Sequence, residues 1–258
     1  MDLKSKKMNI IKPSAQMRQK PLETSELETE CLFGEVIEVL DYYLDWSYCK
    51  LKTDNYYGWL QNENFNYLKP ATHRVISNRT FLFKDKNIKS GFFNYLPLGA
   101  QLSVKSSDDK WFEVDITNKI FKNTAFIPKN HLVTLDHINH DWVSTAEKLI
   151  GTPYMWGGRD SLGIDCSALL QLSFQTFGED IPRNTNEQIK LDKEQIEDRN
   201  ILERGFVVFW DRHVGIMVDG NKCIHANAFN METIIEPLKE IENRIGKAIK
   251  IMNFNKIV

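Results

Sequence analysis

The sequence has little cysteine, no excess of charge of one sign and no long apolar run. Its 258 residues include only four cysteines, too few for a disulfide framework, so each must be judged by its own surroundings. Lysine and arginine total 33 against 35 aspartate and glutamate residues, which is not the basic excess of a nucleic-acid-binding protein. No apolar segment reaches the roughly 18 to 20 residues that a membrane-spanning helix needs. These absences argue against a disulfide scaffold, a nucleic-acid-binding protein and a membrane span.

What the sequence does have is large apolar side chains: 15 phenylalanines, 8 tyrosines and 6 tryptophans. A chain with this composition can bury a core and is not expected to be disordered. Residues 1–11 contain only short apolar stretches, below the roughly 7 to 15 residues of a signal-peptide core, and free cysteines fit a reducing compartment. We therefore expect a folded, cytoplasmic protein.

An internal repeat occupies the N-terminal half. Gly34 and Gly99 each open a stretch of short alternating apolar runs, and Trp46 and Trp111 each lie 12 positions after that glycine. Such runs, broken by clusters of Asp, Asn and Lys, are typical of small antiparallel β units. The repeat predicts a polar N-terminal arm followed by two small β-barrels, over residues 1–30, 31–70 and 71–135.

The periodicity changes after residue 136. Apolar residues fall at helical spacing over residues 142–150 and again over 165–177, with a glycine after each stretch as a C-terminal cap. Strand-like runs follow, and Asp219-Gly220-Asn221 is a strong hairpin-turn signal between two of them. Helices first and an antiparallel sheet second predict an α+β domain over residues 136–258. The chain is thus predicted to be multidomain, with two all-β barrels before an α+β domain.

Cys166 is the candidate nucleophile. A glycine-rich loop precedes it and an apolar stretch at helical spacing follows it, which places its sulfur at a helix N-terminus. Unpaired backbone N–H groups and the helix dipole favour an anion there and lower the pKa of a thiol. The alternative is a buried structural cysteine, which is common for a free cysteine. Three others fall in apolar strand patterns and are interpreted as core: Cys31, Cys49 and Cys223.

Two histidines beside the predicted hairpin can complete a catalytic site. A three-residue turn pairs Val218 with Lys222, and this register puts His213 and His225 on one face as diagonal neighbours. His213 could then accept the proton of Cys166 while His225 orients its ring, an arrangement expected for acyl transfer. A two-residue turn would put the histidines on opposite faces, where they would be ordinary satisfied polar side chains.

Four motifs in order carry a resemblance to a known family. They are Gly151-Thr152-Pro153-Tyr154-Met155-Trp156-Gly157-Gly158-Arg159, Ile164-Asp165-Cys166-Ser167-Ala168-Leu169, His213-Val214-Gly215-Ile216 and Ile224-His225-Ala226. In this order and spacing, residues 140–258 resemble the NlpC-type papain-like cell-wall cysteine peptidases. The two upstream repeats look like the bacterial SH3-like barrels often attached to these enzymes. The whole is most similar to the γ-D-glutamyl-L-diamino acid endopeptidases, which trim free murein peptides.

The resemblance implies a role for each matching residue. Cys166 matches the nucleophile, His213 the base and His225 the third polar residue. Tyr154 and the Cys166 backbone N–H would hold the oxyanion. For substrate binding, the resemblance implies that the Asp165 carboxylate binds the free α-amine of an N-terminal L-alanine. It implies supporting roles for Ser167 and Thr185, and for Glu35 and Tyr56 of the first barrel.

Glu35 has independent support from the repeat. Its counterpart in the second barrel is Ala100, so the barrel fold does not require a carboxylate there. Together with Asp165 it would surround a cationic amine and reject peptides whose N-terminus is blocked, because a buried unpaired charge is costly. The alternative is a solvated surface glutamate.

The sequence therefore predicts a cysteine endopeptidase that hydrolyses the bond between γ-D-glutamate and a diamino acid, diaminopimelate or lysine, in peptidoglycan turnover or recycling. Its partner would be a small murein peptide, and it would need no metal or organic cofactor. The run from Asp136 to Asp141 is interpreted as linker polarity and not as a metal site. Two alternatives stay open: an amidase or acyltransferase acting on another amide, and a non-catalytic protein that binds cell-wall peptide. The oligomeric state is not indicated.

Overall fold

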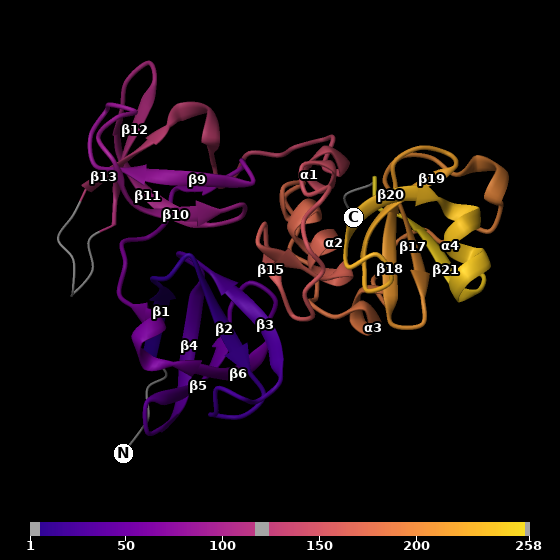
Figure 1. The fold of residues 1–258 in the computed structure, drawn as a ribbon, viewed down its shortest axis with the longest axis horizontal. Coiled ribbons are helices and arrows are strands. Elements are labelled where there is room, and N and C mark those ends of the chain that lie inside the picture. Colours follow the sequence, from indigo (N-terminus) through magenta and orange to yellow (C-terminus); the bar gives the residue numbers. More distant parts are fainter. Residues whose placement is uncertain (1–5, 117–123, 256–258) are drawn as a thin grey trace. The chain divides into compact units, whose positions relative to one another are not determined.

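The chain divides between His137 and Ile138 into two units. The computed structural model describes residues 6–116 and 124–255. Each unit has its own sheets and buried core, and Figure 1 shows their elements in chain order. Among the residues described, no helix is both long and apolar enough to cross a membrane.

The first barrel is a seven-stranded antiparallel sheet in the order β3-β2-β6-β5-β4-β1-β7. Its strands are β1 (Lys6–Ile10), β2 (Ser14–Arg18), β3 (Leu27–Leu32), β4 (Val36–Tyr43), β5 (Trp46–Leu51), β6 (Tyr57–Gln61) and β7 (Phe65–Asn66), with a 3-10 turn η1 (Asn62–Asn64). Side chains alternate across the sheet, so that Ile37 and Val39 of β4 both point into the core.

Residues 6–30 belong to this barrel, whereas the sequence predicted an N-terminal arm over residues 1–30. Strand β1 pairs with β4 and β7, and β2 pairs with β3. Only one face of β2 is buried, through Ala15 and Met17. A half-buried strand among polar residues gives a weak sequence signal, which is why the arm prediction is wrong for these residues. The first five residues of the arm lie outside the described part of the chain.

The second barrel repeats the first strand for strand. Its order, β10-β9-β13-β12-β11-β8-β14, is the order of the first sheet advanced by seven strands. The internal repeat in the sequence is therefore a duplicated fold. Its elements are β8 (His73–Val75), β9 (Arg79–Phe83), β10 (Phe92–Pro97), β11 (Gln101–Ser107), β12 (Trp111–Asp115), β13 (Thr124–Pro128), η2 (Lys129–His131) and β14 (Leu132–Thr134).

The repeated glycines mark equivalent turns in the two barrels. Gly34 and Gly99 both have positive φ, at +83° and +85°, a conformation that glycine adopts without steric cost. At Gly34 space is also decisive, because an added Cβ would lie 1.8 Å from the carbonyl oxygen of Gln101. The neighbouring carbonyl of Phe33 accepts the backbone N–H of Gln101 at 2.8 Å. The first unit is joined through this close backbone contact.

The second unit is the predicted α+β domain. A five-stranded antiparallel sheet runs in the order β20-β19-β18-β17-β21, and α2 packs against β18 and β19. The helices are α1 (Val143–Glu147), α2 (Cys166–Gln175), α3 (Thr185–Gln188) and α4 (Leu238–Ile245), with η3 (Arg199–Ile201). The strands are β15 (Arg159–Asp160), β16 (Gly163–Ile164), β17 (Phe206–Trp210), β18 (His213–Met217), β19 (Lys222–Asn227), β20 (Glu232–Pro237) and β21 (Lys250–Asn253).

Every residue of α2 is buried, including its four polar residues Ser167, Gln171, Ser173 and Gln175. The three cysteines interpreted as core are also fully buried in the barrel and sheet interiors: Cys31, Cys49 and Cys223.

Candidate active site

Cys166 is the first residue of α2 and is 8% exposed. Asp165 caps the helix, accepting the Ala168 backbone N–H at 2.8 Å, as expected for an aspartate at this position. The thiol is hydrogen-bonded by the Thr185 hydroxyl and by the backbone N–H of Val214. Because Val214 directly follows His213, this second bond brings the start of β18 to the sulfur.

The electrostatics of the thiol differ from the prediction. Burial, followed by the negative charge of Asp165, raises the pKa of Cys166 to about 11, although Val214, Thr185 and Arg183 act in the opposite direction. The free-energy cost of burying an ionised sulfur here exceeds the stabilisation that the helix N-terminus gives the anion. The predicted lowering of the thiol pKa is therefore wrong, and the resting sulfur is a neutral thiol.

The two histidines lie on the same face, as the three-residue turn predicts. The Val218 N–H donates to the Lys222 carbonyl at 2.9 Å, and Ile216 pairs with Ile224. His213 Nε2 lies 2.7 Å from His225 Nδ1. Burial, then the neighbouring His225, lower the pKa of His213 to about 3, so its ring is a neutral base at physiological pH. A cavity of about 260 Å³ borders both rings.

Two residues that the sequence did not single out extend this pair. Glu236 on β20 lies 2.7 Å, through Oε1, from His225 Nε2, and Arg244 on α4 donates to both oxygens of Glu236. A hairpin between β19 and β20 would have pointed to Glu236, but its turn has no glycine. Met231 there adopts a φ of +57°, which side-chain-bearing residues other than Asn and Asp rarely do.

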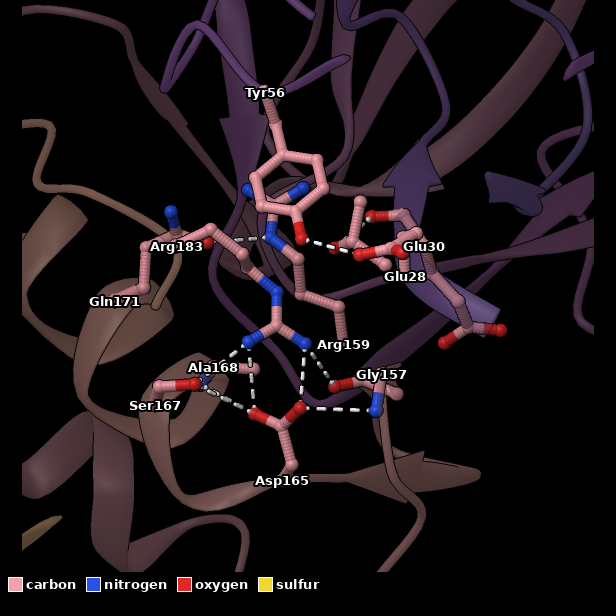
Figure 2. Close-up of polar contacts among 12 residues, drawn as sticks. Glu28, Glu30, Tyr56, Gly157, Arg159, Asp165, Ser167, Ala168, Gln171 and Arg183 are labelled. Atoms are coloured by element: carbon pink, nitrogen blue, oxygen red, sulfur yellow. Dashed lines mark hydrogen bonds and ion pairs between the residues drawn. The ribbon is translucent and has the colours of Figure 1, made fainter. Parts of the chain in front are cut away.

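Asp165 does not present a free carboxylate. Arg183 forms a two-pronged ion pair with it, at 2.6 Å and 2.9 Å, and both side chains are largely buried. Figure 2 shows this pair with the three further donors to the carboxylate: the backbone N–H groups of Gly157 at 3.0 Å and Ala168 at 2.8 Å, and the Ser167 hydroxyl at 3.1 Å.

These contacts give no support to the amine-binding role expected of Asp165, and that role stays a prediction. Five donors meet a group that has about four lone-pair sites, and its charge is already balanced by Arg183. Ser167 is engaged as well, because its hydroxyl also accepts from Arg183 at 2.8 Å. Arg183 is therefore a site residue that the sequence analysis missed. Its partner could be identified only once the segment carrying it was folded against α2.

Tyr154 lies near the nucleophile and is half-buried. Burial, the largest cause, raises the pKa of its hydroxyl well above the ordinary value. Its backbone is held by a hydrogen bond to the Met231 carbonyl at 2.9 Å and by a bridge to Ile164. The phenol therefore stays protonated and can donate a hydrogen bond.

The two expected residues of the first barrel both have hydrogen-bond partners within that barrel. Glu35 is 2% exposed and accepts the Leu32 N–H at 2.7 Å and the Thr53 hydroxyl at 3.0 Å. The surface alternative is thus wrong, and these contacts tie Glu35 to its own turn. The Tyr56 hydroxyl donates to Glu28 at 2.6 Å (Figure 2). Their roles toward a peptide stay predictions.

Comparison with known families agrees with this arrangement. The NlpC/P60 family model matches residues 151–243, the stretch that contains Cys166, His213 and His225. These residues form an NlpC/P60 domain. The family is one of cysteine peptidases. Upstream of the NlpC/P60 domain, residues 17–65 match the bacterial dipeptidyl-peptidase SH3 domain. The family and fold class predicted from the sequence are both confirmed.

The similarity to known proteins extends beyond the NlpC/P60 domain. A γ-D-glutamyl-L-lysine dipeptidyl-peptidase of Bacillus subtilis is 25% identical over 84% of this chain and 79% of its own length. Dipeptidyl-peptidase 6 of Lysinibacillus sphaericus is 26% identical over 90% and 91%. The crystal structure of an NlpC/P60 family protein from Bacillus cereus superposes with a TM-score of 0.85 at 18% identity, over 97% of this chain and 100% of that one. The structural likeness shows the fold.

Proposed function

We propose that this protein is a cysteine endopeptidase that cleaves the bond between γ-D-glutamate and the following diamino acid in murein peptides with a free N-terminal L-alanine. The observation that carries the proposal is the hydrogen-bonded pair of His213 and His225 beside a buried cysteine at a helix N-terminus. Similarity to the γ-D-glutamyl-L-lysine dipeptidyl-peptidase of Bacillus subtilis supports the peptide class, and similarity to dipeptidyl-peptidase 6 of Lysinibacillus sphaericus supports a peptidase. Turnover or recycling of peptidoglycan is the setting in which such peptides arise.

Acylation starts from a neutral Cys166 thiol and a neutral His213 imidazole. Because burial raises the pKa of Cys166 and lowers that of His213, the thiol proton moves to the imidazole as the sulfur attacks the γ-carbonyl carbon. His213 Nε2 is bonded to His225, so Nδ1 is the nitrogen that takes this proton. The Cys166 backbone N–H, which has no intrahelical partner at the first helical position, and the Tyr154 hydroxyl stabilise the oxyanion.

Collapse of the tetrahedral intermediate breaks the carbon–nitrogen bond. The His213 imidazolium gives its proton to the departing α-amine of the diamino acid, and a thioester remains on Cys166. Water, deprotonated by the same imidazole, attacks the thioester carbon and releases the dipeptide L-Ala-D-Glu with a free γ-carboxylate. The thiolate takes back the proton, and the site returns to its neutral state.

The preference for a free amine needs a different source from the one first expected. Asp165 is saturated by five donors and neutralised by Arg183, so a substrate ammonium would find no unmatched charge there. We assign Asp165, Ser167 and Arg183 to holding the start of α2. The free-amine preference itself remains part of the proposal.

The deciding experiment incubates the protein with L-Ala-γ-D-Glu-diaminopimelate, with the corresponding L-Lys peptide, and with N-acetylated copies of both. Mass spectrometry should find L-Ala-D-Glu and the free diamino acid with wild type and with Cys223→Ala, a matched control at a buried cysteine, but not with Cys166→Ala. Absence of cleavage by wild type, or cleavage by Cys166→Ala, would refute the peptidase assignment. Equal turnover of the acetylated copies would refute only the free-amine preference.

A further inference from the structure

Four side chains form a continuous polar line leading away from the thiol. His213 Nε2 meets His225 Nδ1 at 2.7 Å, and His225 Nε2 meets Glu236 Oε1 at 2.7 Å. Arg244 Nη1 donates to Glu236 Oε2 at 3.2 Å, and its Nη2 donates to Oε1. The middle of the line is largely buried, since the His225 side chain is 1% exposed and that of Glu236 is 16% exposed.

Each ring in this line has one proton to place. Burial lowers the pKa of both His213 and His225, so each is a neutral imidazole with one donor and one acceptor nitrogen. Burial alone would favour a protonated Glu236. Hydrogen bonds from Arg244 and His225 nevertheless hold the pKa of this carboxyl below its usual value, and Glu236 is therefore an ionised acceptor.

An ionised acceptor at the end of the line decides every proton before it. Glu236 requires Nε2–H on His225, which leaves His225 Nδ1 as an acceptor. His213 must then carry its proton on Nε2 to donate to it. This leaves His213 Nδ1 unprotonated, and a general base must have an unprotonated nitrogen to accept the proton.

A competing arrangement is built into the same site. The amide nitrogen of Asn227 lies 3.3 Å from His225 Nε2, and its orientation is set because Asn227 Oδ1 accepts the Asn230 N–H at 2.8 Å. An N–H donor at this place favours a bare Nε2 on His225. Both rings would then reverse, and the proton of His213 would sit on Nδ1, where it blocks proton transfer from the thiol.

We propose that Glu236, held by Arg244, is a positioning residue that fixes the ring tautomers of His225 and His213 against the opposing pull of Asn227. The inference rests on the proposed function and adds to it a residue that touches neither substrate nor nucleophile. Glu236 acts through two rings, as carboxylates behind metal-bound or catalytic histidines do.

The test combines kinetics with ¹⁵N NMR of histidine-labelled protein without substrate. Wild type should show Nε2–H on both rings. Glu236→Ala should move the proton of His213 to Nδ1 and lower kcat by on the order of 10²- to 10⁴-fold, as expected for a wrong tautomer, with little change in KM. Glu236→Gln keeps an acceptor oxygen and should retain the wild-type tautomers with a smaller loss. Glu240→Gln, an exposed residue of α4, should match wild type.

Rescue gives the sharpest readout. Adding Asn227→Asp to Glu236→Ala replaces the competing donor by an acceptor, and it should restore Nε2–H on both rings and most of the lost kcat. Nδ1–H on His213 in wild type, or unchanged tautomers in a folded Glu236→Ala, would overturn the proposal. The wild-type spectrum decides even if Glu236→Ala does not fold. The NMR readouts need no substrate, so they stand apart from a failure of the proposed peptidase activity.

Discussion

Replacing Arg183 with methionine should destabilise the second unit by about 3 to 5 kcal/mol, the usual cost of breaking a buried ion pair from one side. The Arg183 side chain is 1% exposed and the Asp165 side chain 10%. The substitution removes both charge-assisted bonds to Asp165, at 2.6 Å and 2.9 Å, and leaves its carboxylate buried with neutral donors only. Against a total stability of about 5 to 15 kcal/mol for a domain, this is a large fraction.

The assay is urea unfolding of the full chain, followed by far-UV circular dichroism in the helical region, since the α-helices of the described residues lie in the second unit. Combining Arg183→Met with Asp165→Asn should recover part of the loss, because the uncompensated charge is gone. A loss below about 1 kcal/mol for Arg183→Met would refute the ion-pair reasoning. So would an Asp165→Asn variant of wild-type stability that no longer discriminates between free and acetylated peptides, because it would return Asp165 to amine binding.

Three further predictions follow from the pKa directions and from one glycine. Alkylation of Cys166 by iodoacetamide, measured against Cys166→Ala, should be slow near neutral pH and accelerate as the pH approaches about 11; rapid reaction in mild acid would show a resting thiolate. Folding lowers the pKa of His213 to about 3. When the pH falls below the ordinary pKa of histidine, the unfolded chain binds a proton at His213 that the folded chain does not. The free energy of unfolding therefore decreases as the pH falls, by about 2 kcal/mol at about pH 5. His213→Asn should remove this share of the pH dependence, and an unchanged acid slope would contradict it. Gly34→Ala should lower the free energy of unfolding of the first unit by about 2 kcal/mol or more, because the added Cβ would lie 1.8 Å from the Gln101 carbonyl oxygen. The control is Gly91→Ala, which should lower it less, since Gly91 has a φ of +75° but an added Cβ would meet no atom within 4 Å.

Much of the architecture was determined by the sequence alone, since it depends on local periodicity. The duplicated barrel followed from the spacing of glycine and tryptophan around Gly34 and Gly99, where the chain makes equivalent tight turns. The sequence reduced the alignment of His213 with His225 to the length of one hairpin turn, two or three residues, and the structure shows the three-residue register; strand residues alternate faces, so that register places both rings on one face. Such features are encoded within a few residues of the chain.

Only the tertiary structure decided which charges are matched and which groups are buried. Asp165 and Arg183 lie 18 positions apart, and His225 and Glu236 lie 11 apart across a turn without glycine. The thiol pKa likewise depended on burial, which outweighs the helix N-terminus that the local sequence indicates. Ion pairing and desolvation act between atoms in space, whatever their separation along the chain. The sequence therefore determined where the nucleophile and histidines stand, and tertiary packing decided their protonation and the partners that hold them.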